Sequence, residues 1–380
     1  MPNDNAKYDA HYKLLTPYFD SRSYIENYGQ FEETDLADPL THYLKIGAKK
    51  GYNPNPFFDS NFYLHANKDI AQAGMNPFVH YLGYGFREGR LPISNNTIST
   101  KICGYKISDP AMNLANWRIP CIINADLSDS ALDINEITKT INATEATATI
   151  LNRDSKDWLI VFSGRGENFY YLNKMKSFWG NVLFLRDTSA TYYSQNPNLP
   201  AAHLISAYID YLTGPRMGKT IIVGQSSGGH AALYQSSFIQ NALTFGFSPQ
   251  AYHPDLYPHN LYFEEGINKA IPTESAPDLV ARLQEITDGP RYVVVGKSES
   301  SHEDSYYWGD TLSAGVIAAT GKCSVIVVNR KEHPTIQYLD TPKLFNLLQA
   351  NYDLFLNNRH AASKLFCSSA LYYIKPVSRG

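Results

Sequence analysis

One serine stands in a pattern that could support nucleophilic chemistry. Ser226 is the central residue of Gly-Gln-Ser-Ser-Gly, residues 224–228, between the β-favouring run 220–223 and a helix-compatible run. A sharp strand-to-helix turn strains its central residue and exposes the hydroxyl, and glycines are needed where strand and helix cross. We therefore predict that Ser226 is a nucleophile. A glycine-rich turn without chemistry, or one that binds phosphate, is the alternative.

A nucleophilic serine needs hydrogen-bond donors for the oxyanion of its tetrahedral intermediate. The N–H of Ser227, at the start of the following helix, is one expected donor. The second is expected from Gly164 or Arg165, in the Ser-Gly-Arg-Gly loop after the apolar run 158–162. Ser227 is less suited than Ser226 as a nucleophile, because Gln225 and not a glycine stands two residues before it.

Continuous apolar runs alternate with helical patterns in the last 280 residues or so, which predicts an α/β fold. Such strands form a mostly parallel sheet covered on both faces, with ligands beyond the carboxyl ends of the strands. Expected strands are 102–107, 121–125, 146–151, 158–162, 181–185, 220–223, 243–247, 291–295 and 324–328. Expected helices lie around 169–178, 202–212, 277–286, from 305 and from 342.

This alternation, together with Gly-x-Ser-x-Gly, resembles the α/β-hydrolase fold over residues 100–357, roughly. The resemblance implies a triad in the chain order serine, acid, histidine, with each partner just past a strand end. His333 fits the histidine, because it follows the apolar run 324–328 in a loop. Its role would be to take the serine proton and return it to the leaving group. His302 is the alternative base, and His230, on the nucleophile helix, is expected to pack near the site.

The acid of the triad is expected in the loop after the run 291–295. Asp304 is the first choice, to orient the histidine and to stabilise the imidazolium. Glu303, Glu299 and Asp310 are the alternatives. Asp304 could also merely cap the helix that begins next.

Several further residues could contact a substrate at the same edge of the sheet. Arg165 and Arg186 each follow an expected strand and could hold a carboxylate or phosphate, although an ion pair with Asp187 equally explains Arg186. Gln225 precedes the nucleophile, and Tyr252 opens a tract rich in Tyr, Pro and His that extends to residue 263. That tract could stack on sugar rings or pack its own aromatic side chains.

The first 94 residues contain a repeat with an offset of 38 to 39 residues, which predicts two helical units. Phe-Asp-Ser at 19–21 matches 58–60, and the stretch 38–47 matches 76–85. The aspartates are expected helix caps, and Gly51 and Gly89 expected helix ends. His42 and His80 recur at one place, and packing explains them better than metal binding. Residues 95–101 are polar and are expected to link this domain to a catalytic domain, 102–380.

Composition excludes several functions. The 380 residues carry 33 Lys and Arg against 36 Asp and Glu, so no nucleic acid or anionic membrane is indicated as partner. The four cysteines form no Cys-x-x-Cys pair, so neither a zinc site nor a dithiol redox site is supported, and no metal or organic cofactor is expected. No apolar run is long enough for a membrane span or a leader peptide, so a cytoplasmic protein is expected.

Two further resemblances concern biological context. Residues 58–92 are similar to the Phe-Asp-x-x-x-Tyr-Leu … His-Tyr-Leu-x-x-Gly-x-x-Glu-Gly-Arg-x-Pro repeats that accompany bacterial glycosyltransferases. Ser-Gly-Arg, Leu-Arg-Asp, Gly-x-Ser-x-Gly-Gly and Phe-Ser-Pro-Gln, at 163, 185, 224 and 247, resemble hydrolase-like proteins encoded with capsule and exopolysaccharide genes. The resemblances imply a serine esterase or O-acyltransferase acting on acyl groups of a surface polysaccharide or its precursor. The alternative is a non-catalytic scaffold whose repeats dock a glycosyltransferase or self-associate.

Overall fold

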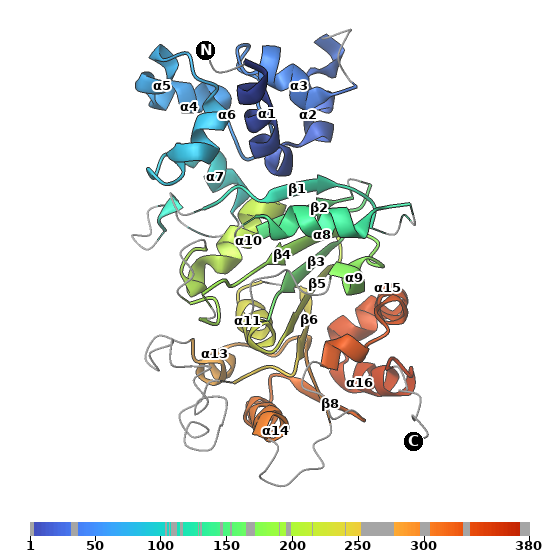
Figure 1. Cartoon of the computed structure of the whole chain (residues 1–380). Helices are drawn as coiled ribbons and strands as arrows, with labels where there is room; N and C mark the ends of the chain where they lie inside the picture. Colours follow the sequence, from blue (N-terminus) through green and yellow to red (C-terminus); the bar gives the residue numbers. More distant parts are fainter. Residues whose placement is uncertain are drawn as a thin grey trace.

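The computed structural model describes most of the chain. The described residues are 4–31, 37–102, 105, 107, 112–114, 117–127, 129, 131–144, 147–152, 154–164, 172–189, 191–194, 199–214, 216–239, 241–251, 277–296, 305–329 and 335–372. Figure 1 shows a helical N-terminal region beside one end of a twisted sheet, with helices flanking that sheet.

The sheet has eight strands in the order β1-β2-β4-β3-β5-β6-β7-β8. The strands are β1 (Cys121–Asn124), β2 (Thr147–Leu151), β3 (Trp158–Phe162), β4 (Asn181–Leu185), β5 (Thr220–Gln225), β6 (Ala242–Phe247), β7 (Arg291–Gly296) and β8 (Ser324–Val328). All neighbouring pairs are parallel except β2 with β4. The predicted fold class, an α/β-hydrolase-like and mostly parallel sheet, is confirmed. The strand predicted at 102–107 is not seen, since Ile102, Tyr105 and Ile107 lie outside any strand.

The central strands are continuous apolar runs because both of their faces are covered. Val161 on one face of β3 packs in a core with helices α8, α9, α15 and α16, whereas Ile160 on the other face packs with α10 and α11. A third cluster joins α11, α13 and α14 to Val293. The helices are α8 (Ile134–Asn142), α9 (Leu172–Met175), α10 (Ile205–Thr213), α11 (Ser227–Gln235), α13 (Leu279–Glu285), α14 (Ser305–Ala319), α15 (Thr341–Asn357) and α16 (Arg359–Ser368).

The N-terminal region begins with α1 (Asp4–Leu15) and continues in two successive helical units. The first unit contains α2 (Ser21–Tyr28) and α3 (Pro39–His42), which continues as a π-helical turn, 43–47. The second contains α4 (Ser60–Ala66), α5 (Lys68–Gln72) and α6 (Pro77–His80), followed by the π-helical turn 81–85. The predicted caps are confirmed: the carboxylates of Asp20 and Asp59 accept hydrogen bonds from backbone N–H groups at the third residue beyond each.

The two recurring histidines are structural, as the packing explanation predicted. The hydroxyl of Tyr24 lies 2.8 Å from Nδ1 of His42, and that of Tyr63 lies 2.8 Å from Nδ1 of His80. Both histidines are more than nine-tenths buried. Each hydroxyl occupies the space that a Cβ would need at the glycine closing the π-helical turn, so the two units use the same device.

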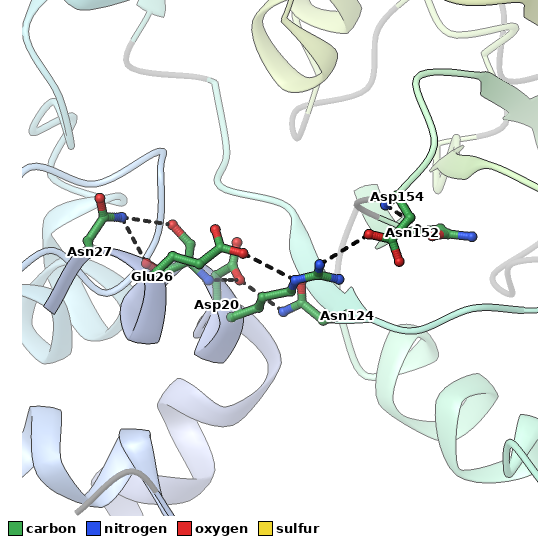
Figure 2. A network of polar contacts seen from close by, with 8 residues as sticks. Asp20, Glu26, Asn27, Asn124, Asn152 and Asp154 are labelled. Carbon is green, nitrogen blue, oxygen red and sulfur yellow. Dashed lines mark hydrogen bonds and ion pairs between the residues drawn. The ribbon is translucent and has the colours of Figure 1, made fainter. Parts of the chain in front are cut away.

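The repeats are bonded directly to the sheet. The buried carboxylate of Asp20, besides capping α2, accepts from Nδ2 of Asn124 at the end of β1 (2.9 Å), as Figure 2 shows. In the same network Arg22 lies 3.4 Å from Asp154, in the turn after β2. The segment expected as a linker forms helix α7 (Asn95–Lys101). Its Lys101 ammonium donates to the carbonyl of Pro56 (2.9 Å), so the segment packs back on the second unit.

None of the described helices is both long and apolar enough to cross a bilayer.

Candidate active site

Ser226 occupies the turn between β5 and α11 in a backbone conformation that non-glycine residues seldom adopt. Its φ is 59° and its ψ −122°, and it is the N-cap residue of α11. The Ser226 N–H donates to the carbonyl of Phe247 at the end of β6 (2.9 Å), and its carbonyl accepts from the N–H of His230 (3.0 Å). Such strain costs about 1–3 kcal/mol and persists only where surrounding contacts enforce it. The predicted sharp turn is therefore present.

Glycines around Ser226 are required by the close crossing of strand and helix. A Cβ on Gly224 would lie 2.9 Å from the amide nitrogen of Gly229, and one on Gly228 would lie 2.6 Å from the carbonyl oxygen of Ser163. Both obstacles are backbone atoms, which cannot rotate away as a side chain can. The Gly-x-Ser-x-Gly spacing is thus a steric requirement of this turn.

Two of the three predicted oxyanion donors lie beside Ser226. Ser227 begins α11, so its N–H belongs to the first turn of the helix, where partial positive charge favours an anion. Gly164 also lies beside Ser226, because a Cβ built on it would lie 3.9 Å from the Ser226 Cβ and 3.0 Å from the Gln225 carbonyl oxygen. Arg165 lies outside the described residues.

Gln225 connects the nucleophile to the chain that follows β8. Its side chain is 3% exposed, and its Oε1 accepts from the N–H of Ile336 (3.3 Å). The neighbouring Thr335 is fully buried, with its hydroxyl 3.4 Å from that of Ser248 after β6. The segment 335–338, a short 3-10 helix, is therefore anchored beside Ser226. Gln225 was predicted to contact substrate; in the structure its Oε1 accepts the hydrogen bond from the Ile336 N–H.

The predicted base and acid fall outside the part of the chain that the structure describes. This holds for His333 and Asp304, for the alternatives His302, Glu303 and Glu299, and for Tyr252. Asp310 is described: it lies in α14 and is 3% exposed. Three residues after it, the Ser313 hydroxyl accepts from the N–H of Ala251 (3.1 Å), in the loop after β6. That face of α14 therefore packs against the edge that carries Ser226.

Arg186 and Asp187 follow β4 at the same edge, but both are buried. The Arg186 guanidinium donates to the carbonyl of Thr144, which precedes β2. The Asp187 carboxylate accepts from the N–H groups of Thr191 (2.7 Å) and Tyr193 (2.9 Å) and from the Ser189 hydroxyl (2.6 Å). The acid thus organises residues 189, 191 and 193 of the turn after β4.

Two residues of this edge were missed by the sequence reasoning. Tyr192 and Tyr193 are consecutive residues with positive φ, 54° and 64°. The Tyr193 hydroxyl donates to the carbonyls of Ser163 and Leu185, and that of Tyr192 to Oε1 of Gln250 (2.9 Å). Left-handed tyrosines have no sequence signature. The Asp-x-Ser-x-Thr spacing at 187–191, which supplies the loop's hydrogen bonds, was the available signal.

His230 packs behind the nucleophile, as expected. It is fully buried, its Nδ1–H donates to the carbonyl of Gln250 (2.8 Å), and its ring centroid lies 5.1 Å from that of Tyr192. Burial lowers the pKa of His230 to about 4, because the charged form loses its hydration, although the Gln250 carbonyl and the Asp278 carboxylate act in the opposite direction. The imidazole is therefore neutral at pH 7.

No cluster of three or more His, Cys, Asp or Glu side chains suited to a metal occurs among the described residues.

Comparisons with known proteins add likenesses of fold. No protein-family model matches the chain, and no curated protein sequence matches it. The capsule O-acetyltransferase of Neisseria meningitidis serogroup A is similar in structure over 55% of this chain and 92% of that one, at 16% identity and a TM-score of 0.38. Est1E from Butyrivibrio proteoclasticus is similar over 55% of this chain and 94% of that one, at 10% identity and a TM-score of 0.38. MenH from S. aureus is similar over 56% of this chain and 99% of that one, at 12% identity and a TM-score of 0.35. Likenesses this distant assign no reaction or substrate.

Proposed function

We propose that the protein is a serine esterase or O-acyltransferase that works through an acyl-enzyme on Ser226. The observation that carries this proposal is the strained conformation of Ser226, φ 59°, at a crossing that its glycines alone permit. A turn that only connected β5 to α11 would need no non-glycine residue there. Phosphate binding is less favoured, because the strain of this turn serves to expose a side-chain hydroxyl.

His333 is proposed as the general base. It lies two positions before Thr335, which is buried beside Ser248, and chain connectivity limits the distance between their Cα atoms to about 7 Å. On the other side, Val328 ends β8 at the carboxyl edge of the sheet. The described anchors on both sides of His333 thus belong to the edge that carries Ser226.

Asp304 is proposed as the acid that orients His333, with Asp310 as the alternative. Asp304 directly precedes α14, and Asp310 lies in that helix. The hydrogen bond between Ser313 and Ala251 fixes α14 against the loop after β6. This contact supports an acid from the start of α14 on the side of the sheet that carries Ser226, and replacing Asp304 and Asp310 one at a time can distinguish them.

The proposed reaction has two steps. Ser226 Oγ attacks the acyl carbonyl while its proton passes to His333, and the oxyanion accepts from the N–H groups of Ser227 and Gly164. The ester C–O bond then breaks, and the proton leaves with the alcohol. Water or a sugar hydroxyl next attacks the acyl carbon and loses its proton to His333. The bond between the acyl carbon and Ser226 Oγ then breaks, and His333 returns the proton to Ser226 Oγ.

The acyl acceptor or donor is proposed to be a bacterial surface polysaccharide or its precursor. The support is the resemblance of the motifs at 163, 185, 224 and 247 to hydrolase-like proteins of capsule assembly, together with the repeats. An acyltransferase differs from an esterase only in which nucleophile resolves the acyl-enzyme, so one measurement can distinguish them.

That measurement follows 4-nitrophenyl acetate cleavage with and without glycan oligosaccharides, and mass spectrometry detects acetylated sugar. We expect nitrophenol release to fall by about 1,000-fold or more in Ser226→Ala and in His333→Ala. Asp304→Asn should lower kcat much more than Asp310→Asn. Acetylated sugar identifies a transferase, and acetate alone an esterase. Turnover in Ser226→Ala equal to that of the wild type would contradict the proposal, and no turnover by the folded wild type would favour a scaffold.

A further inference from the structure

A cavity of about 420 Å³ lies at the edge of the sheet opposite to Ser226. Trp158 and Asn181, which line it, are the first residues of β3 and β4, and Met217, which also lines it, precedes β5. Ser226 follows the last residue of β5, so the length of that strand separates the two places. Sites for small organic molecules have volumes of roughly 300–1,000 Å³, and this cavity falls within that range.

Three parts of the molecule form the walls of this cavity. Phe57 directly precedes the second repeat, Lys101 ends α7, and Tyr211 belongs to α10. Helices α7 and α10 lie side by side (Figure 1). The rings of Phe57, Tyr211 and Trp158 are more than nine-tenths buried, whereas Met217 is 78% exposed. The cavity therefore offers fixed aromatic walls and one exposed apolar side chain to a ligand.

Among the described residues that line the cavity, the charged ones are two lysines, Lys101 and Lys156. The Lys101 ammonium lies 4.3 Å from the centroid of the Phe57 ring and 5.4 Å from that of Tyr211. It also donates to the Pro56 carbonyl (2.9 Å). An ammonium has three N–H donors, and neither a ring face nor a carbonyl carries a full negative charge. The contacts that the structure shows therefore leave the charge of Lys101 without an anionic partner.

The pKa of Lys101 reflects this poor compensation of its charge. Burial lowers the pKa to about 8, because the ammonium loses part of its hydration. An anion bound beside it would supply an opposite charge and raise the pKa again. The hydrogen bond to Pro56 is accessible to solvent, so a ligand in the cavity can reach the ammonium. Lys156, in the turn after β2, is exposed and has no ion pair with any residue that the structure describes.

We propose that this cavity binds a small organic anion, with an aromatic or other apolar body and a carboxylate or phosphate head group. The body contacts Trp158 and Met217, and the head group accepts from the Lys101 ammonium. Lys156 adds a second positive charge at the wall. A ligand in this place touches the chain before the second repeat and the sheet at once, and thereby stabilises their junction. The proposal does not depend on the reaction assigned to Ser226.

Lys219 provides a matched control. Its ammonium lies 5.6 Å from the centroid of the Tyr352 ring and donates to the Gln349 carbonyl (2.8 Å), so it makes the same two kinds of contact as Lys101. Both lysines are half-buried, but Lys219 does not line the cavity. Lys101→Met and Lys219→Met therefore remove the same charge and similar contacts, and only Lys101→Met alters the cavity.

The experiment measures binding to full-length Ser226→Ala protein by calorimetry, so that no ester is turned over. The probes share one ring system: 2-naphthoate carries a carboxylate, 2-naphthyl phosphate a phosphate, and 2-naphthamide no charge. We expect at least one anion to bind, and 2-naphthamide to bind at least about tenfold more weakly. Lys101→Met should weaken binding of the anion about tenfold or more, and Lys219→Met less than about twofold.

A second measurement leaves the cavity unaltered and decides the question if Lys101→Met does not fold. Both anions keep a nearly constant charge between pH 7 and pH 9, whereas Lys101 loses its proton as pH rises through about 8. The groups that face Lys101 are Tyr211, whose pKa is raised by burial, and Lys156. Affinity for the anion that binds better should therefore fall about threefold or more from pH 7 to pH 9. Lys219→Met should show the same fall.

The anion that binds better distinguishes a carboxylate site from a phosphate site. The proposal is overturned if 2-naphthamide binds as tightly as the anions, or if neither anion binds to the folded protein. Equal losses of affinity in Lys101→Met and Lys219→Met, or an affinity that is the same at pH 7 and pH 9, would also overturn it. None of these results bears on the chemistry of Ser226, which is measured separately with the wild type.

Discussion

Glycine makes room in two regions of this molecule, but for different atoms. In the repeats, Gly47 and Gly85 leave space for the hydroxyls of Tyr24 and Tyr63, each of which lies within hydrogen-bond distance of a buried histidine. Around Ser226, Gly228 leaves space for backbone carbonyls, and Ser226, between Gly224 and Gly228, has positive φ.

The glycines of the repeats therefore serve packing, whereas those around Ser226 serve the proposed chemistry. In the repeats, glycine leaves room for a tyrosine hydroxyl to reach a buried histidine, so that polar atoms inside the core are paired. None of Gly47, Gly85, Tyr24 and Tyr63 has positive φ. The turn at Ser226 uses glycine to allow a strained conformation, which surrounding contacts must then maintain. Changes in the two regions should therefore have different consequences, as the following predictions state.

The largest effect is expected from Gly228→Ala. Its Cβ would lie 2.6 Å from the Ser163 carbonyl oxygen, so strand and helix must separate. We expect a loss of about 3 kcal/mol or more in the free energy of unfolding, measured with urea, together with loss of nitrophenol release. Gly83→Ala is the matched control, because a Cβ there meets nothing within 4 Å. Equal stability of the two variants would contradict the steric account.

The next effect concerns pH and His230. Its pKa is lowered to about 4 in the fold, so between pH 6.5 and pH 4 the unfolded chain binds a proton that the folded chain does not. Stability from this histidine is complete above pH 6.5, falls as pH decreases, and is lost below about pH 4; the difference is about 3 kcal/mol. Urea unfolding of wild type and His230→Gln across this range tests it. A wild-type curve as flat as that of the variant would contradict the lowered pKa.

A smaller and reversible effect is expected in the repeats. Gly85→Ala should destabilise the protein by about 2 kcal/mol, because the new methyl displaces the Tyr63 hydroxyl from His80. Removing that hydroxyl in Tyr63→Phe should reduce the cost of Gly85→Ala to below about 1 kcal/mol, a non-additivity that a double-mutant cycle measures. If the two free-energy losses were fully additive, a contact other than the Tyr63 hydroxyl would limit the space beside Gly85. Nitrophenol release should not change in any of these variants.

The smallest effect on stability is expected from Gln225→Leu, which removes the acceptor for the Ile336 N–H but keeps the side chain buried. We expect a loss of about 1–2 kcal/mol. If the segment 335–338 positions His333, kcat should fall about tenfold while KM stays the same. Asn351→Leu, which replaces an amide that donates to the Leu347 carbonyl in the same helix, controls for polarity. An unchanged kcat in Gln225→Leu would mean that the hydrogen bond between Gln225 and Ile336 does not position His333.

Much of this arrangement follows from local rules, which is why sequence predicted it. The steric demand at Gly224, which comes from Gly229, the caps Asp20 and Asp59, and the alternating elements each depend on neighbours close in the chain. The antiparallel direction of β2 and the left-handed Tyr192 do not, because both depend on packing with segments far away. The loop of Tyr192 is held by Asp187 and by Gln250, 58 residues later in the chain. Asp304 and His333 remain predictions.

An activated Ser226 is the central claim, and intact mass after fluorophosphonate treatment tests it most directly. The reagent phosphonylates a serine whose proton a neighbouring base removes. We predict one adduct on the wild type, none on Ser226→Ala, and a normal adduct on Ser227→Ala, whose backbone N–H is unchanged. An adduct that persists in Ser226→Ala, or a folded wild type that never reacts, would contradict the assignment of Ser226 as the nucleophile.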